Sequence, residues 1–312
     1  MIQYFSHHAI DKKKWDDCIS RAFNGNIYAL SWYLDVVHSE WEALVENDYE
    51  RVMPLTGAKK FGISYLFQPY FTQQLGIFSK KILNAVVVND FIAHIPAHYQ
   101  FAQINLNVHN QPSDGDFQLY PQKNNLLDLI HDYRKLSSKY TSNTRRNLKK
   151  AQTSGLVLMK GLKPEELVRL FRENRGKQIK HWKTVHYLRL QRLMYTAIYR
   201  GMGLIYGVYT VNNDLCAGAF FLKSHQHLIF LFSATNVQAR ETGAMTFLID
   251  AVIREWASSQ KILDFEGSNN PNLARFYKGF GAKEVNYYRL DFNRLNFPWR
   301  HLVKLKTMWK WG

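Results

Sequence analysis

The stretch from Ile262 to Lys283 constrains the fold of this 312-residue chain more than any other part. A short apolar run ends in Asp264 and Glu266, and a turn-rich patch, a short amphipathic helix and a glycine then precede another apolar run. This order predicts a strand, a loop, a helix and a second strand. It places two acids at the end of a strand, and it places Tyr277 on a helix seven residues beyond Asn270.

Three closely spaced strands are predicted before this stretch, at Gly203–Val211, Leu215–Ser224 and His227–Thr235. The second half therefore reads helix, helix, three antiparallel strands, helix, strand, helix, strand, and the first half has a similar order. Hydrophobic residues make up 46% of the chain, enough for large cores. We predict an α+β protein with two domains, 1–135 and 136–312, each a mostly antiparallel twisted sheet flanked by helices.

A loop in the first half, Gln68–Phe78, interrupts the predicted strands. Pro69 argues against a central strand, and Gly76 permits a close backbone approach. Ser79 is predicted to cap a helix that follows the loop. A loop before a helix N-terminus can hold an anion or a substrate carbonyl, which makes Gln68 and Gln74 candidate substrate-binding residues, or it can be an ordinary connection.

The formal net charge is +16, which indicates either a solvated basic surface or an anionic partner. The densest cluster of cations is Arg145, Arg146, Lys149 and Lys150, on a helix that Ser142 or Asn143 is predicted to cap. This helix is either a solvated face or a surface that docks a phosphorylated substrate or an acyl donor, with Arg145 and Arg146 as the candidate ligands.

Cysteine usage and hydropathy narrow the class of protein further. Cys18 and Cys216 lie far apart and no Cys/His cluster has metal-ligand spacing, so no metal is expected. We find neither a signal peptide nor an apolar run of about 18 residues, which predicts a cytoplasmic protein. The tail Phe297–Trp311 reads as a basic amphipathic helix that either packs back on the first domain or makes a peripheral contact with the inner face of the membrane. We expect no DNA partner.

Two segments of the second half, together with its element order, resemble the GNAT N-acyltransferase superfamily. Arg240 and Gly243 match the loop that binds the pyrophosphate of acyl-CoA in that superfamily, (Gln/Arg)-x-x-Gly-x-(Gly/Ala), whereas Met245 stands where a small residue is expected. The resemblance implies that Arg240, Gly243 and Ala244 bind acyl-CoA as co-substrate, through backbone N–H groups at a helix N-terminus. Met245 would narrow that approach.

The second segment is Asn270-x-x-Leu273-x-x-x-Tyr277-x-x-x-Gly281, similar to the GNAT pattern Asn-x-x-Ala-x-x-x-Tyr-x-x-x-Gly. In that superfamily the tyrosine often protonates the departing CoA thiolate. The resemblance therefore makes Tyr277 the candidate general acid, although a tyrosine on a short apolar helix can equally be a core residue. It also implies that backbone N–H groups of residues 232–234 (Phe232, Ser233 and Ala234) hold the acyl carbonyl, between two parallel strands that splay apart.

The two acids at the strand end are candidate general bases. Because alternate residues of a strand share a face, Asp264 and Glu266 are expected to point the same way, and either could accept a proton from an amine. The alternative for each acid is to cap the next helix or to pair with an arginine. Ser268 and Asn270 are expected to form the turn and the helix cap.

Nearly the whole chain also resembles the tandem-GNAT FemABX-like and BioF2-like acyltransferases. The segments that carry this resemblance are TRRNLKKA at Thr144–Ala151, QPYFTQQLG from Gln68, and DFEGS with FYKGFG in the second half. Fem-type ligases commonly have Phe-Lys-x-x-Phe-Gly in the last helix, where this chain has Tyr277 in place of the lysine.

The resemblance implies an N-acyltransferase that moves an acyl group from acyl-CoA to a small-molecule or peptide amine. A first alternative is a Fem-like ligase that moves an amino acid from aminoacyl-tRNA to a cell-wall precursor. A second alternative is a non-catalytic GNAT-fold protein that binds an anion or a membrane.

Overall fold

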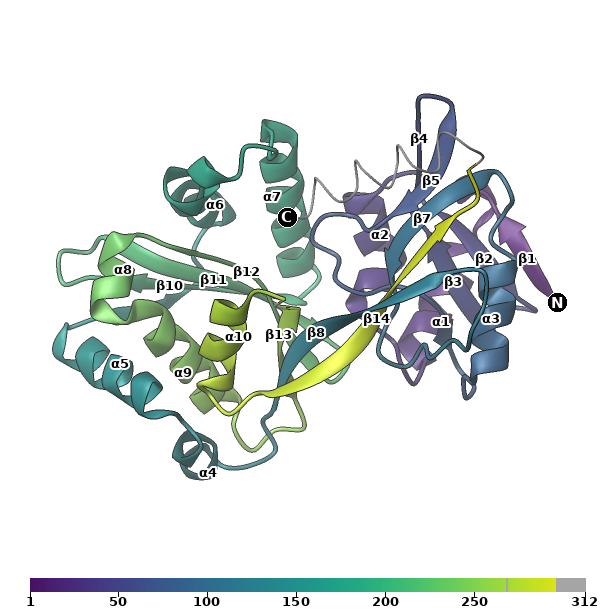
Figure 1. The fold of residues 1–312 in the computed structure, drawn as a ribbon. Coiled ribbons are helices and arrows are strands. Elements are labelled where there is room, and N and C mark those ends of the chain that lie inside the picture. Colours follow the sequence, from purple (N-terminus) through teal and green to yellow (C-terminus); the bar gives the residue numbers. More distant parts are fainter. Residues whose placement is uncertain (268, 296–312) are drawn as a thin grey trace. The chain divides into compact units, whose positions relative to one another are not determined.

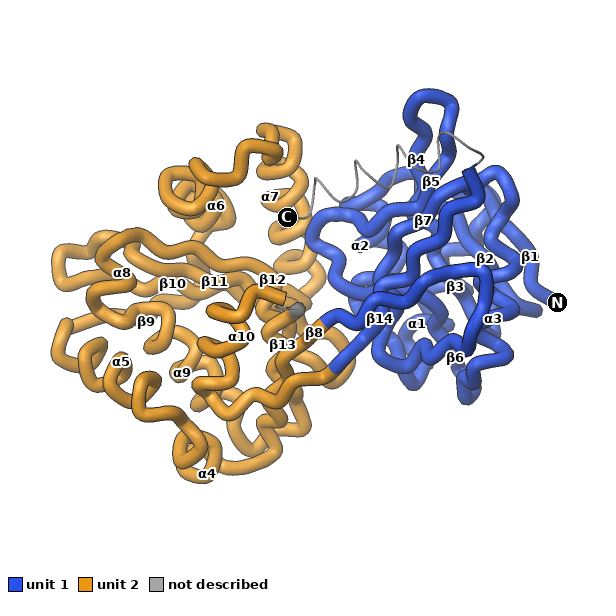
Figure 2. Tube along the Cα trace, viewed as in Figure 1, with its two compact units in different colours: residues 1–122, 286–312 blue, residues 123–285 orange. Residues whose placement is uncertain are grey.

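The computed structural model describes residues 1–267 and 269–295. It is a mixed α+β fold with mostly antiparallel strands, as predicted (Figure 1). The chain divides into two compact units, unit 1 with residues 1–122 and 286–312, and unit 2 with residues 123–285 (Figure 2). These units differ from the predicted domains 1–135 and 136–312, because most of β14 (Lys283–Asn293), the last strand among the described residues, belongs to unit 1.

Unit 1 contains two groups of hydrogen-bonded strands. The first group is the antiparallel sheet β1-β2-β3-β6, and the second has the order β4-β5-β7-β14 with β5 parallel to β7. Their bounds are β1 (Ile2–Phe5), β2 (Glu42–Glu46), β3 (Arg51–Leu55), β6 (Phe78–Ser79), β4 (Gly57–Lys60), β5 (Ile63–Phe67), β7 (Tyr99–Asn105) and β14 (Lys283–Asn293).

The helices of unit 1 are α1 (Lys12–Arg21), α2 (Ser31–Val37) and α3 (Ala85–Ala93), with short 3₁₀ helices at His7–Ala9 and Ile27–Ala29. The Asp11 side chain caps α1 by accepting the N–H groups of its first turn. The predicted cap of α3 at Ser79 is wrong. Ser79 lies in β6, and Asn84 caps α3 by accepting the N–H of Val87.

Unit 2 is built on strands in the order β8-β13-β12-β11-β10-β9, in which only β12 and β13 are paired in parallel. Their bounds are β8 (Gln118–Asp128, of which residues 123–128 belong to unit 2), β9 (Val157–Lys160), β10 (Gly203–Tyr209), β11 (Leu215–Ser224), β12 (His227–Thr235) and β13 (Ile262–Gly267). The three central strands fall where the sequence predicts them.

Helices cover both faces of this sheet (Figure 1). The helices of unit 2 are α4 (Tyr133–Ser138), α5 (Ser142–Thr153), α6 (Pro164–Glu173), α7 (Thr184–Tyr199), α8 (Val237–Thr242), α9 (Ala244–Trp256) and α10 (Pro271–Lys278), with a 3₁₀ helix η3 at Arg175–Gln178. On one face, α9 and α10 contribute to a core with Phe221, Phe230 and Phe265. On the other face, Phe171 of α6 packs against Phe232 of β12, with ring centroids 4.7 Å apart. The sheet of unit 2 thus lies between two layers of helices.

The tail 297–312 and Ser268 lie outside the described residues. Among residues 1–267 and 269–295, no helix is long and apolar enough to cross a membrane. The same residues hold no group of three or more His, Cys, Asp or Glu side chains placed to bind a metal ion.

Candidate functional site

The parallel ladder between β12 and β13 opens partway along its length. The paired residues are His227 with Ile262, Leu228 with Leu263, and Ile229 with Asp264. Beyond this point β12 continues to Thr235 and β13 to Gly267 without further pairing between them. Strand edges that separate in this way leave backbone N–H and C=O groups free for a ligand. The splayed pair that the GNAT resemblance implied is therefore present, and we take it as the candidate site.

A β-bulge in β12 lies at the start of this opening. Phe230 pairs with Phe221 of β11, whereas Phe232 pairs with Phe220, so the residue between them is extra. Farther along, the N–H of Asn236 donates to Cys216 O of β11. Because backbone groups alternate sides along a strand, Ser233 turns its N–H away from β11 and toward the opening. Of the three residues predicted to hold a carbonyl through N–H groups, Ser233 is the one with the required direction.

The end of β13 departs from a regular strand at Glu266. Its register against β8 shifts between Asp264 and Gly267, and Glu266 has a φ of 59°, a left-handed conformation that is rare outside glycine. Regular alternation along the strand therefore stops before Glu266. The two-residue spacing of Asp264 and Glu266 consequently does not place them on a common face. A strained residue at a strand end costs roughly 1–3 kcal/mol and is typical of functional sites.

Asp264 is tied into the protein by two contacts. It is 3% exposed, its Oδ1 accepts the N–H of Glu266 at 2.8 Å, and its Oδ2 lies 3.4 Å from Nδ1 of His227. The carboxylate thus holds the irregular turn at Glu266 and pairs across the ladder with β12. These contacts favour Asp264 as a positioning residue.

Tyr277 lies on α10 beneath the opening. The Asn270 side chain caps this helix by accepting the N–H groups of Asn272 and Leu273, as the sequence predicts for Asn270. The Tyr277 ring stacks on Phe265 of β13, with centroids 4.6 Å apart and planes at 18°, and meets Phe230 of β12 edge-on. The helix thereby places Tyr277 between the two strands that separate.

The environment of Tyr277 keeps its hydroxyl protonated. The side chain is 7% exposed, and burial followed by the negative charge of Glu266 raises the pKa of the phenol well above its ordinary value. Within the described part of the chain, no hydrogen bond to this hydroxyl is found. Tyr277 is therefore both a core residue, through its ring, and an available proton donor, through its hydroxyl. The two alternatives left open by the sequence are compatible.

The loop predicted to bind pyrophosphate has a structural use for its glycine. Gly243 has a φ of 73°, ends α8 and begins α9. An added Cβ there would lie 2.6 Å from the backbone oxygen of Asn147 in α5. Ala244 is fully buried and Arg240 is exposed. Helix α5 thus packs closely against Gly243 at the start of α9, where the resemblance implied that phosphate oxygens would bind.

The basic helix is α5, and its cations are on the surface. Thr141 caps it, in place of the predicted Ser142 or Asn143, by accepting the N–H of Thr144. Arg145 donates to Ser138 O, and Arg146 donates to the side chain of Asn143.

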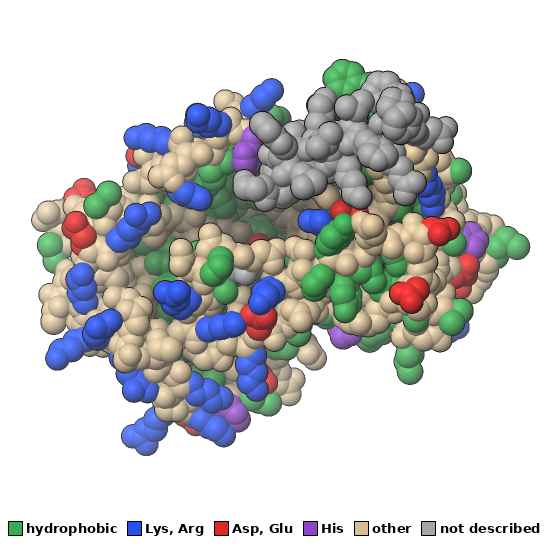
Figure 3. Space-filling model, in the orientation of Figure 1, with side chains coloured by type: hydrophobic (Ala, Val, Ile, Leu, Met, Phe, Trp, Pro, Cys, Tyr) green, Lys and Arg blue, Asp and Glu red, His purple; other side chains and the backbone are tan. Residues whose placement is uncertain are grey.

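Positive charge is concentrated in the unit that contains this helix. Residues 123–285 contain 26 Lys and Arg against 12 Asp and Glu, which accounts for +14 of the net +16. Figure 3 shows Lys and Arg side chains over α4 and α5. Unit 2 therefore carries the positive field that an anionic substrate would meet.

Gln68 and Gln74, the candidates from the first half, belong to unit 1 and hold their own loop. Gln68 donates to Thr72 O and accepts the N–H of Asn105. Gln74 is 5% exposed and accepts the N–H of Val108. These contacts account for both side chains as supports of the loop between β5 and β6.

Two polar residues that contact or flank β13 were not predicted from the sequence. Asn125 of β8 is completely buried, and neither atom of its amide has a hydrogen-bond partner within residues 1–267 and 269–295. It lies opposite the register shift of β13, since its neighbours Asn124 and Leu126 pair with Gly267 and Asp264. His227, the partner of Asp264, was also missed. Neither residue belongs to a motif, and only the pairing of strands distant in sequence brings them to the site.

Solved structures of similar fold cover almost the whole chain. FemX matches with a TM-score of 0.67 at 13% identity, over 94% of this chain and 98% of that one. A conserved protein of unknown function from Bacteroides thetaiotaomicron VPI-5482 matches with a TM-score of 0.63 at 9% identity, over 94% and 100%. L-PGS from Bacillus licheniformis matches with a TM-score of 0.56 at 12% identity, over 96% of both chains.

These likenesses concern the fold alone. No family model matches the sequence, and no curated protein matches it either. The chain shares the fold of FemX over almost its whole length, which confirms the FemABX-like resemblance found in the sequence.

Proposed function

We propose that this protein is a transferase that moves an acyl or aminoacyl group from a carrier to an amine acceptor. The observation that carries this proposal is the opening between β12 and β13, with Ser233 N–H on one edge and Tyr277 beneath it. The N–H would hold the carbonyl oxygen of the acyl group, where negative charge develops during transfer. The fold that this chain shares with FemX also supports the proposal.

The residues can be assigned to the steps of amide formation. The amine nitrogen attacks the carbonyl carbon, and the bond between that carbon and the sulfur or oxygen of the carrier breaks. Glu266 accepts the proton that the amine loses, directly or through water, and Tyr277 gives a proton to the departing sulfur or oxygen. Burial raises the pKa of this phenol, so it carries its proton at neutral pH, and the same shift makes it a weaker acid than a free tyrosine.

Tyr277 favours acyl-CoA as the donor. In the GNAT superfamily, which the sequence resembles, the tyrosine at this position often protonates the departing CoA thiolate. An aminoacyl-RNA is the second candidate, and a different observation supports it. The start of α9 is covered by Asn147 of α5, which leaves little room for a pyrophosphate at Gly243, whereas the +14 of unit 2 suits a polyanionic carrier.

A labelled-donor assay tests the proposal and separates the two carriers. The full chain is incubated with radiolabelled acyl-CoA of several chain lengths, or with tRNA charged with labelled amino acids, and with a panel of small-molecule and peptide amines. We expect label in an amide product from one class of donor. Binding of both donors without transfer to any amine would instead favour a non-catalytic protein.

A further inference from the structure

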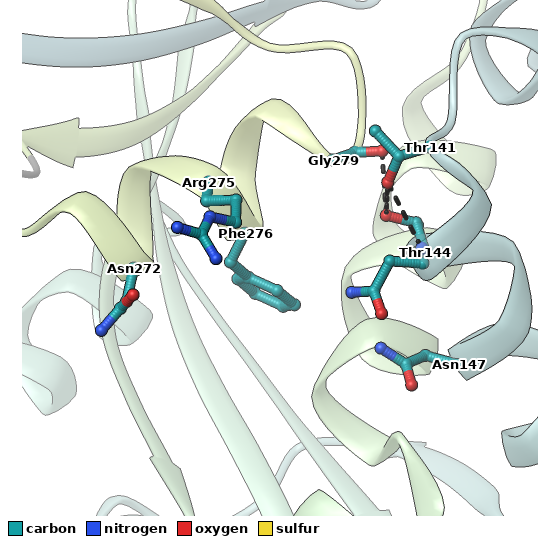
Figure 4. Close-up of a pocket in the computed structure, with 8 residues that line it drawn as sticks. Thr141, Thr144, Asn147, Asn272, Arg275, Phe276 and Gly279 are labelled. Carbon is teal, nitrogen blue, oxygen red and sulfur yellow. Dashed lines mark hydrogen bonds between the residues drawn. The ribbon is translucent and has the colours of Figure 1, made fainter.

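A pocket of about 510 Å³ lies between α5 and α10, both in unit 2, and the reaction as assigned does not use it. It is lined by Thr141, Asn143, Thr144 and Asn147 on the α5 side, and by Asn272, Arg275, Phe276 and Gly279 on the α10 side (Figure 4). This volume is in the range of sites that hold a small ligand such as a mononucleotide. Arg275 and Phe276 immediately precede Tyr277, so the pocket adjoins the proposed acid along α10.

The two walls of the pocket are fastened at one end. The Thr144 hydroxyl donates to Gly279 O at 2.9 Å, and the Thr141 N–H donates to the same oxygen at 3.0 Å. A Cβ on Gly279 would lie 2.6 Å from the Thr144 hydroxyl oxygen, so this contact requires glycine. These two hydrogen bonds hold the start of α5 against the end of α10.

The groups that face the pocket are donors, amides and one aromatic ring. The Arg275 guanidinium has neither an ion-pair nor a hydrogen-bond partner within the described part of the chain, and the side-chain amides of Asn147 and Asn272 make no hydrogen bond there either. None of the described residues that line the pocket carries a carboxylate. Figure 4 shows the Phe276 ring and the Asn147 amide on opposite sides of the space between the helices.

We propose that this pocket binds a phosphorylated adenosine, the nucleotide end of the acyl carrier. A guanidinium binds phosphate oxygens as a fork, amide groups pair with the edges of a base or with ribose hydroxyls, and an aromatic ring stacks on a base. Coenzyme A and the 3′ end of tRNA both carry adenosine and phosphate, so the chemistry is shared by the two donors. The pocket would take over phosphate binding from Gly243, which α5 covers.

This inference rests on the proposed function for the identity of the ligand, but its test does not require turnover. Calorimetric titration of the full chain uses two probes, adenosine 3′,5′-bisphosphate for the tail of coenzyme A and the trinucleotide CCA for the end of tRNA. We expect one probe to bind, and Arg275→Ala to weaken it at least tenfold. Arg275→Lys keeps the positive charge but loses the planar guanidinium. Its affinity for the probe should therefore lie between those of the wild type and Arg275→Ala.

The matched control is Lys278→Ala, which removes the same charge from the same helix outside the pocket, where Lys278 pairs with Glu284. Its affinity should be that of the wild type. Equal weakening by Arg275→Ala and Lys278→Ala, or no binding of either probe at millimolar concentration, would overturn the proposal. Transfer by the wild-type chain with an unchanged donor KM in Arg275→Ala would refute the pocket and keep the proposed function. Loss of probe binding in Arg275→Ala, together with no transfer by the wild-type chain, would support the pocket and refute the proposed function.

Discussion

Replacing Gly243 by alanine should destabilise unit 2 more than the same change at another left-handed glycine. Gly243 has a φ of 73°, and Gly201 has a φ of 68°. An added Cβ at Gly243 would meet Asn147 O at 2.6 Å, whereas an added Cβ at Gly201 would meet no atom within 4 Å. The pair therefore separates backbone strain from the contact with α5.

The expected magnitudes follow from these two environments. A left-handed alanine costs roughly 1–2 kcal/mol at either position. Only Gly243→Ala also has to push a backbone oxygen away, and overpacking of this kind costs a further 1–3 kcal/mol or so. We therefore expect a loss of about 2–5 kcal/mol at Gly243 and about 1–2 kcal/mol at Gly201.

Hydrogen exchange is the suitable assay, because a chain with two units need not unfold in a single step. Peptides from α5 and α9 should lose more protection in Gly243→Ala than in Gly201→Ala. Equal loss in the two variants would refute the contact between α5 and Gly243, and the start of α9 would then be free to bind a pyrophosphate.

Three further outcomes are expected. Thr144→Val removes a buried hydrogen bond to Gly279 O and should lower the local free energy of unfolding by about 1 kcal/mol, measured by hydrogen exchange of peptides from unit 2. Trp182→Ala removes a ring that packs on Phe232, which should destabilise the protein by about 2–4 kcal/mol in the same assay. At high pH, burial raises the pKa of Tyr140 and of Tyr277 above the unfolded value of about 10. Stability should therefore be complete below pH 10 and fall above it, with tyrosinate absorbance rising together with the loss of circular dichroism.

Unchanged stability in Thr144→Val would show that α5 is not fastened at Gly279. A Trp182→Ala variant as stable as wild type would show that the aromatic packing on β12 contributes little. Tyrosinate absorbance that rises fully near pH 10 without loss of structure would contradict the burial of the two tyrosines.

Much of the fold was predictable because local patterns agree with it. The three strands between 203 and 235 are separated by short turns, and their apolar content specifies a buried sheet. Asn270 before Pro271 specifies the start of α10. The cap of α3 was missed because Ser79 and Asn84 are both good capping residues, and the pairing of Phe78 and Ser79 with β3 decides between them.

The site was less predictable, since its geometry depends on contacts between distant segments. The motif around Tyr277 located the helix, but the burial of its ring against Phe265 comes from the sheet. Alternation predicted a common face for Asp264 and Glu266, and the bulge at Glu266 breaks it. The glycine of the loop at 240–245 matches a phosphate-binding pattern in sequence, yet its close neighbour is Asn147, almost a hundred residues earlier.

Single-turnover transfer by Tyr277→Phe is the most direct test of the central proposal, that the hydroxyl of Tyr277 protonates the departing carrier. Because that hydroxyl has no hydrogen-bond partner among the described residues, the variant should fold as wild type does, and donor affinity should be unchanged. The rate of amide formation should fall by roughly 10²–10⁴-fold. A Tyr277→Phe protein that transfers the acyl group at the wild-type rate would contradict the account.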